Sequence, residues 1–170
     1  MRLRPFILEK DFDQMKDWIE DERTNAMWCA GHLSYPVDKE SMKLFLRVFS
    51  LKTGDMPFVA TTDEGRPVGF FCYSLNLETN EGMLKFVVVD PNERGKGTAV
   101  QMLNLAAKYA FEITKADVLH LNVFAENLRA RKCYEKAGFV ERNTTPGAFK
   151  YKDESWGRCN MALYKNDESR

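Results

Sequence analysis

The chain has 170 residues and carries 25 Lys plus Arg against 25 Asp plus Glu, so its formal net charge is zero. This length suits one domain with a sizeable core, and we expect a single domain over residues 1–170. Apolar residues make up 44% of the chain, which excludes a disordered or low-complexity protein. The balanced charge excludes a chain-wide basic excess that would neutralise phosphates, so we expect no nucleic-acid partner.

The four cysteines are widely spaced, with no C-x-x-C pair and no neighbouring histidine cluster: Cys29, Cys72, Cys133 and Cys159. This spacing disfavours a disulfide framework and a zinc site, so we expect no metal. The first ten residues lack the apolar run and the cleavage site of a signal peptide. No stretch reaches the about 18–20 apolar residues of a membrane-spanning helix. We therefore expect a cytoplasmic protein that has no membrane partner.

The first half of the chain predicts helices and strands in succession. An opening strand is expected over residues 2–9, and Asp11 is expected to cap the first helix. The mixed segment 21–35 is expected to be partly loop, and a second helix should begin at Asp38 or Ser41. Three strand-like segments follow, with turn signals at Asp63-Glu64-Gly65 and Glu81-Gly82: residues 56–62, 67–77 and 83–89.

The second half predicts the order strand, helix, strand, helix, strand. A polar loop leads from the strand at 83–89 into a long helix over 97–114. A strand at 118–123 and a short helix at 127–136 follow. The remainder is expected to hold a short strand, a polar loop, a final strand and a frayed tail: residues 139–142, 143–154, 156–164 and 165–170. This order indicates an α/β (α+β) architecture and by itself identifies no function.

One loop in the second half carries a chemical signal. A valine-rich strand feeds Glu93-Arg94-Gly95-Lys96-Gly97-Thr98-Ala99, which opens the long helix. The first amides of a helix have no intrahelical partner and the helix dipole adds positive potential, so this loop favours an anion. Its two glycines let a phosphate approach the backbone, and Arg94 and Lys96 add positive charge. Neither a Walker motif nor G-x-G-x-x-G fits, because Val100 stands at the third glycine. A plain strand-to-helix turn stays an alternative.

A second motif follows about 25 residues downstream of this loop. The loop itself matches Q/R-x-x-G-x-G/A through Arg94, Gly97 and Ala99. The downstream pattern N-x-x-A-x-x-x-Y-x-x-x-G-F is matched at every fixed position: Asn127, Ala130, Tyr134, Gly138 and Phe139. With both motifs in order, the chain resembles the GNAT superfamily of acetyl-CoA-dependent N-acetyltransferases. The resemblance implies a mixed, mostly antiparallel central sheet with a splayed strand pair and helices on both faces.

The resemblance also assigns acetyl-CoA as cosubstrate and names the residues that would bind it. The loop amides would hold the pyrophosphate, and the strand before them would pair its backbone with the pantetheine arm. The matching positions are Val87, Val88, Val89, Arg94, Gly95, Lys96, Gly97, Thr98, Ala99, Val100, Asn127 and Tyr134. Tyr134 also matches the general acid that protonates the departing thiolate. Two alternatives stay open, a helix N-cap for Asn127 and a core tyrosine for Tyr134.

The general base is not assigned by this resemblance. The position of the family's usual glutamate, on the strand before the second motif, holds Asn122. An amide orients a water but accepts no proton, so Asn122 is a catalytic candidate only in that sense. Glu81, Asp90 and Glu93 are base candidates by region only, and each is better explained as a solvated loop charge. A base-free mechanism is also open. His120 lies in an alternating strand and could face either side.

The leading hypothesis is direct transfer of an acetyl group from acetyl-CoA to a primary amine. The N-terminal layout, with Trp18, Trp28 and Pro36, is similar to ribosomal-protein N-terminal acetyltransferases, aminoglycoside 6'-N-acetyltransferases and polyamine acetyltransferases. The acceptor, a protein N-terminus or a small amine, therefore stays open. A coenzyme A-binding sensor without chemistry and an acyltransferase with a longer donor are alternatives. A homodimer is implied by the resemblance alone.

Two N-terminal groups bear on the acceptor. The aromatic residues Trp18, Trp28 and Phe45 are expected either to line the acceptor side or to belong to the core. An acidic group would either attract a cationic acceptor or form a solvated helix end: Asp17, Glu20, Asp21 and Glu22.

Overall fold

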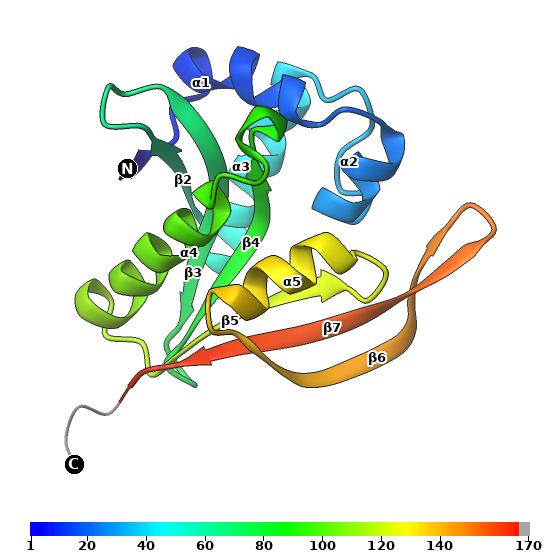
Figure 1. The fold of residues 1–170 in the computed structure, drawn as a ribbon. Helices are drawn as coiled ribbons and strands as arrows, with labels where there is room; N and C mark the ends of the chain where they lie inside the picture. The colour runs from blue at the N-terminus through cyan, green and yellow to red at the C-terminus, as the bar shows by residue number, and fades with distance from the viewer. Residues whose placement is uncertain (167–170) are drawn as a thin grey trace. The chain divides into compact units, whose positions relative to one another are not determined.

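The structure is a computed structural model, and it describes residues 1–166. Seven strands are hydrogen-bonded in the order β1-β2-β3-β4-β5-β7-β6 (Figure 1). The pairs β1–β2, β2–β3, β5–β7 and β6–β7 are antiparallel, whereas β4 and β5 are parallel. The expected mixed, mostly antiparallel sheet is confirmed. The residues group into two compact units, the first from residues 1–74 and 85–102, the second from residues 75–84 and from 103 onward.

The first unit packs helices against an antiparallel ribbon. The strands of the ribbon are β1 (Arg2–Pro5), β2 (Met56–Thr61) and the first part of β3 (Pro67–Asn76). The helices are α1 (Leu8–Met15), α2 (Glu22–Cys29), α3 (Lys39–Thr53) and the start of α4 (Thr98–Lys108). One buried cluster joins α1, α2 and α3 to β2 and β3, and Trp18, Trp28 and Phe45 belong to it. Of the two expectations for these aromatic residues, the core assignment is therefore confirmed.

Acidic N-caps begin α2 and α3. Asp21 accepts a hydrogen bond from the amide of Thr24 at 2.7 Å, and Asp38 accepts one from the amide of Ser41 at 2.9 Å. The expected start of the second helix at Asp38 is confirmed. The segment 21–35 contains α2, which was not expected, and is loop only in its second half. Tertiary burial of one face stabilises this short polar helix, which periodicity alone did not reveal.

The expected role of Asp11 as a helix cap is wrong. The opening strand ends at Pro5, and α1 begins at Leu8 with Asp11 buried inside it. Its carboxylate accepts two hydrogen bonds from Arg4, at 2.8 and 2.7 Å, and one from the amide of Ile7 at 2.8 Å. The side chain thus reaches back to the residue before the helix and ties β1 to α1, a contact that sequence spacing does not show.

The second unit is built around β5 (Val118–Phe124). β4 (Glu81–Val89) pairs with β5 from Glu81–Val118 to Leu84–Leu121, and β7 (Glu154–Tyr164) pairs with it along its whole length. Helix α5 (Leu128–Lys136) precedes β6 (Val140–Tyr151), and the expected helix at 127–136 is confirmed. The long helix expected over 97–114 is also present, since α4 continues as five π-helical residues, Tyr109–Ile113.

Two expectations in this unit are wrong. The segment 143–154, expected to be a polar loop, belongs to the long β6–β7 ribbon (Figure 1). Phe149 packs on Phe124 and Trp156 with ring centroids 5.1 and 5.7 Å apart, which gives this polar strand apolar anchors. Residues 81–82, expected to be a turn, open β4. The turn instead occupies residues 77–80, where the side chain of Asn76 accepts amide hydrogen bonds.

Over residues 1–166, no helix is long and apolar enough to cross a membrane. In that same part of the chain, no group of three His, Cys, Asp or Glu side chains is arranged to hold a metal ion. All four cysteines carry free thiols. Residues 167–170 of the expected frayed tail lie outside the described residues.

Candidate functional site

The glycine-rich loop of the first unit has the backbone of an anion site. Gly95 and Gly97 adopt φ angles of +77° and +76°, in the left-handed region that favours glycine. A Cβ atom at either position would meet no other atom within 4 Å, so both backbones face open space. The first helical hydrogen bond of α4 runs from the amide of Gln101 to the carbonyl of Gly97 at 3.0 Å. The amides of Thr98, Ala99 and Val100 therefore precede the helical ladder and are positioned for an anion.

Charged side chains around this loop form ion pairs. Arg94 contacts Glu20 at 2.8 Å, and Lys96 lies 3.7 Å from Glu93. Glu93 also accepts hydrogen bonds from Arg66 at 2.8 Å and from Thr98 at 3.0 Å. The hydrogen bond from Arg66, then the one from Thr98, lowers the pKa of Glu93 despite some desolvation. Glu93 is thus held as a paired carboxylate, which makes it a poor proton acceptor at neutral pH.

Asp90, the other base candidate by region in this unit, is buried rather than solvated. Its side chain accepts a hydrogen bond from the amide of Asn92 at 2.9 Å and so caps the 3₁₀ turn Pro91–Glu93. Arg66 lies 3.6 Å away. Asp90 shapes the entry to the loop, and nothing in its surroundings singles it out as a base.

The strand before the loop, β4, bends at Phe86, whose φ angle of +54° is unusual for a residue with a side chain. The indole N–H of Trp28 donates to the carbonyl of Phe86 at 2.8 Å and holds this bend from α2. Val87, Val88 and Val89 follow and are half-buried. Sequence analysis named Trp28 but missed Phe86 and the contact between the two, because no local pattern marks an aromatic residue that takes a positive φ.

The second motif lies in the second unit. The side chain of Asn127 accepts a hydrogen bond from the amide of Ala130 at 3.3 Å, so the N-cap alternative is confirmed for this residue. Tyr134 is buried, and its ring packs on Phe139 with centroids 6.0 Å apart. Burial raises the pKa of Tyr134, as does the neighbouring thiol of Cys133. The phenol therefore keeps its proton at neutral pH, the state required of an acid.

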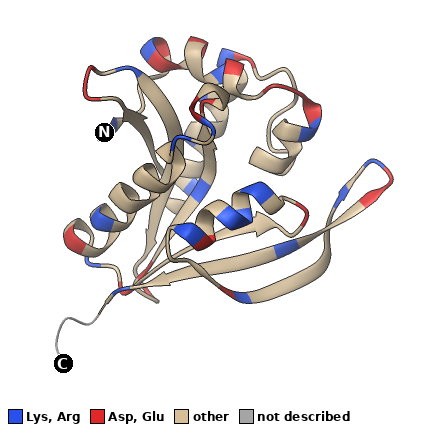
Figure 2. Cartoon of the chain, viewed as in Figure 1, with Lys and Arg blue, Asp and Glu red and all other residues tan. Residues whose placement is uncertain are grey.

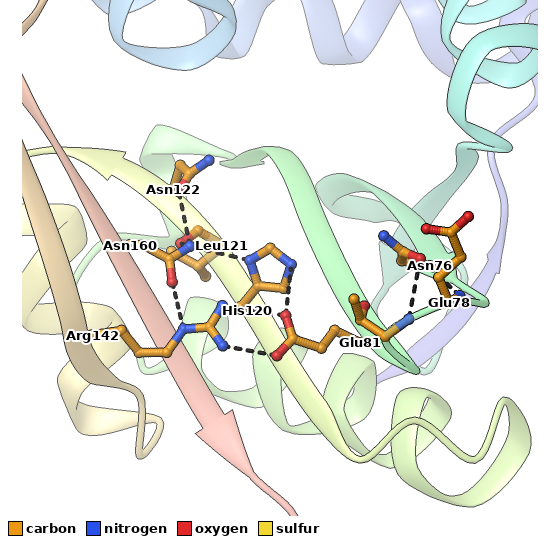
Figure 3. Close-up of polar contacts among 9 residues, drawn as sticks. Asn76, Glu78, Glu81, His120, Leu121, Asn122, Arg142 and Asn160 are labelled. Carbon is orange, nitrogen blue, oxygen red and sulfur yellow. Dashed lines mark hydrogen bonds and ion pairs between the residues drawn. The ribbon is translucent and has the colours of Figure 1, made fainter.

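Asn122 belongs to a polar network on one face of the second unit (Figure 3). Asn160 donates to the side-chain oxygen of Asn122 at 2.9 Å and lies 3.1 Å from Nδ1 of His120. Arg142 donates to Asn160 at 2.7 Å and to Glu81 at 2.9 Å. Of the two orientations open to His120, the structure shows that its ring faces Asn160 and Glu81, on the same side of β5 as Asn122.

The hydrogen bond from Arg142 lowers the pKa of Glu81, with desolvation opposing it. Glu81 is therefore an ion-paired residue of β4 and not a solvated turn charge. Sequence analysis missed Arg142 and Asn160, although both lie in segments expected to be strands, because their contacts with Glu81 and Asn122 depend on how those strands pair.

An open cleft of about 600 Å³ lies in the first unit beside α1 and the segment that leads to α3. Four carboxylates and two lysines contribute to its lining: Asp13, Asp17, Glu20, Asp38, Lys16 and Lys39. Phe12 and Tyr35 add aromatic surface. Glu20 is also the partner of Arg94, so one side chain connects the cleft to the glycine-rich loop.

Comparison with known proteins then decides the family. Residues 12–139 match the model of the acetyltransferase (GNAT) family. The chain belongs to this family. It is an N-acetyltransferase with acetyl-CoA as cosubstrate, as the two motifs predicted.

Among its relatives, a spermidine N(1)-acetyltransferase from Vibrio cholerae is 38% identical over 55 residues, which are 32% of this chain and 32% of that enzyme. That alignment spans about a third of the relative. An aminoglycoside N(6')-acetyltransferase from Klebsiella pneumoniae is 22% identical over 80% of this chain and 72% of its own length. The crystal structure of the Vibrio spermidine N-acetyltransferase with CoA and spermine superposes with a TM-score of 0.79 at 19% identity, covering 96% of this chain and 94% of that one. This likeness confirms the fold.

Proposed function

We propose that this enzyme transfers the acetyl group of acetyl-CoA directly onto a primary amine of a small polycation, the chemical class that includes polyamines and aminoglycosides. The acidic cleft carries this proposal. Its volume of about 600 Å³ lies in the range of small-molecule sites. Carboxylates outnumber lysines four to two in its lining, so it attracts a molecule with several positive charges. The names of the two relatives, acetyltransferases of spermidine and of aminoglycosides, support the same class.

The charge balance of the cleft argues against a protein N-terminus as acceptor. Lys39 is paired with Glu9, outside the cleft lining, and Lys16 lies 3.9 Å from Asp17. Glu20 is likewise paired with Arg94, and the lining keeps two more carboxylates than lysines for the acceptor. An α-amino group brings one charge, whereas a polyamine brings several that can each meet a carboxylate.

The roles of the cosubstrate-binding residues follow from the motifs and the local geometry. Acetyl-CoA supplies the activated acetyl thioester. We assign its phosphates to the amides and cations of the loop from Arg94 to Val100, and its pantetheine arm to the backbone of Val87–Val89 and to Asn127. Helix α5 adds positive charge suited to an anionic cosubstrate through Arg129, Arg131, Lys132 and Lys136 (Figure 2).

We assign to Tyr134 the proton that the departing thiolate takes up. Burial favours the protonated phenol, so the group is ready as an acid across the neutral range. Asn122 is assigned to orient a water at the acceptor amine. We further propose that the enzyme acts in the cytoplasm, where the four free thiols fit the reducing conditions. The expected homodimer stays a prediction, which light scattering of the purified protein tests.

The test is an acceptor panel with acetyl-CoA as donor and release of the free thiol as readout. The panel holds spermidine, an aminoglycoside, a monoamine of similar length and a peptide with a free N-terminus. A higher kcat/KM for either polycation than for the monoamine and the peptide supports the proposal, and the two polycation arms identify the class member. A higher kcat/KM for the peptide overturns it. Binding of acetyl-CoA without turnover of any amine would favour a coenzyme A-binding sensor. A faster reaction with longer acyl donors would favour an acyltransferase that uses a longer donor.

A further inference from the structure

The bend of β4 at Phe86 brings two successive side chains to one face of the strand. Neighbouring residues of a regular strand point to opposite faces. Here Nζ of Lys85 lies 2.8 Å from Asp55, just after α3, and 5.6 Å from the ring centre of Phe49 in α3. The ring of Phe86 packs on the same Phe49, with centroids 5.1 Å apart. The positive φ angle of Phe86 accounts for this break in the alternation.

Side chains of α2 and α3 hold this bend in place. Three rings pack around that of Phe86, with centroids 4.7 to 6.3 Å away: Trp28, Phe45 and Phe49. The indole N–H of Trp28 donates to the carbonyl of Phe86 at 2.8 Å, and Trp28 is only 8% exposed, so water competes little for this bond. A residue with a side chain keeps such a φ angle only where its surroundings impose it. All these residues belong to the first unit.

The peptide bond between Phe86 and Val87 carries the effect one step further. This bond is trans, so its C=O and its N–H point in opposite directions. The indole from α2 fixes the direction of the C=O and therefore also the direction of the N–H of Val87, which points away from the indole. Trp28 thus orients a main-chain donor with which it shares no hydrogen bond.

The amide of Val87 lies where the reacting end of the cosubstrate is expected. The phosphates are assigned to the loop from Arg94 to Val100, and the pantetheine arm to the backbone of Val87–Val89. Because the loop follows Val89, the arm leads from the loop back along the strand, and its sulfur end reaches Val87. On the basis of the proposed function, we infer that Trp28 is a positioning residue of this acetyltransferase, which aims the N–H of Val87 at the carbonyl oxygen of the acetyl thioester.

An N–H aimed in this way stabilises charge that develops during the transfer. As the C–N bond forms, the electron pair of the C=O bond moves onto the oxygen, and it returns when the C–S bond breaks. A donor that is already oriented stabilises this transient charge more than it stabilises the bound thioester, so it raises kcat. Neither Trp28 nor Val87 gains or loses a proton, so the proton transfers assigned above are unchanged.

The test compares the wild type with Trp28→Phe, which removes the N–H donor and keeps an aromatic ring. The first measurement is the infrared stretch of the thioester carbonyl in bound acetyl-CoA, isotopically labelled at that carbon, without acceptor. A hydrogen bond weakens the C=O bond, so the wild-type band should lie below that of free acetyl-CoA, and Trp28→Phe should return it towards the free value. The Kd of CoA, which lacks the carbonyl, should stay unchanged. The kcat of Trp28→Phe should fall about 10- to 100-fold.

The matched control is Trp18→Phe, the same change at another buried position of the same apolar cluster. This variant should keep the wild-type band and kcat. A wild-type band at the free frequency, an unmoved band in Trp28→Phe, or a loss of kcat in Trp28→Phe smaller than about threefold overturns the inference. Equal effects in both variants also overturn it, because they would reflect a loosened core.

If Trp28→Phe does not fold, Trp28→3-benzothienylalanine decides by the same criteria, because it keeps the two-ring shape and replaces the N–H by sulfur. The proposed function fails separately, when the wild type acetylates no amine. The infrared band of bound acetyl-CoA requires no acceptor and still tests the role of Trp28 in that case.

Discussion

Gly97→Ala is the sharpest perturbation of the glycine-rich loop, because its effects on stability and on binding can be separated. The residue has a φ angle of +76°, and a Cβ there meets no other atom within 4 Å. The substitution therefore strains the backbone without a clash inside the protein. Gly54, at the end of α3, has a φ angle of +69° and the same open surroundings. Gly54→Ala is thus a matched control remote from the loop in sequence.

The magnitudes follow from this geometry. A residue with a side chain in the left-handed region costs about 1–2 kcal/mol, which lowers the melting temperature of a chain of this size by roughly 2–8 °C. Both variants should show this loss and remain folded. In Gly97→Ala alone, the added methyl group occupies space that we assign to a phosphate. Loss of one charge-assisted hydrogen bond to that phosphate, worth about 1.5–3 kcal/mol, weakens acetyl-CoA binding by roughly 10- to 100-fold.

The assay is calorimetric titration with acetyl-CoA, paired with thermal unfolding of the same preparations. Gly97→Ala should raise the Kd at least about tenfold, and Gly54→Ala should leave the Kd unchanged at a similar melting temperature. A wild-type Kd for Gly97→Ala would show that the loop does not hold the phosphates. Equal losses of affinity in both variants would show that backbone strain, and not the site, controls binding.

Three further predictions follow from other contacts. Tyr134→Phe should lower kcat about 10²-fold and leave the Kd of acetyl-CoA unchanged, and equal losses of both would contradict an acid role. Asp11→Asn should lower the free energy of unfolding by about 2 kcal/mol at pH 7, because Arg4 loses a buried partner. Burial opposes ionisation of Asp11, but the hydrogen bonds from Arg4 outweigh it and lower its pKa. This stabilisation is therefore present above the unfolded-state pKa of about 3.9 and is lost as the pH falls through the lower folded-state value, so urea unfolding should show the difference shrinking near pH 3. Asp17→Asn should raise the KM for a polycation about two- to fivefold and spare a monoamine, and an equal change for both would count against the acidic cleft.

Several features of this protein were determined by the sequence alone. The two motifs identified the family, and the helix over 127–136 and the strand over 118–123 were placed close to their observed bounds. The positive φ angles at Gly95 and Gly97 confirm the turn expected between the valine-rich strand and α4. These features depend on residues that are close together in the sequence, through hydrophobic periodicity, helix caps and the glycines of turns. Such short-range effects can be recognised in a single stretch of chain.

The network around His120 was decided only by tertiary structure. Glu81, His120, Arg142 and Asn160 lie on four different strands, and strand pairing brings them together. The register of β6 against β7 shifts between Glu141 and Asn143, which leaves Arg142 as the extra residue and directs it to Glu81. Sequence patterns do not predict such a bulge, or the pairing of a polar ribbon, because both depend on contacts between distant residues. The family was therefore evident from local motifs, whereas the polar network around Asn122 and His120 required the register of the sheet.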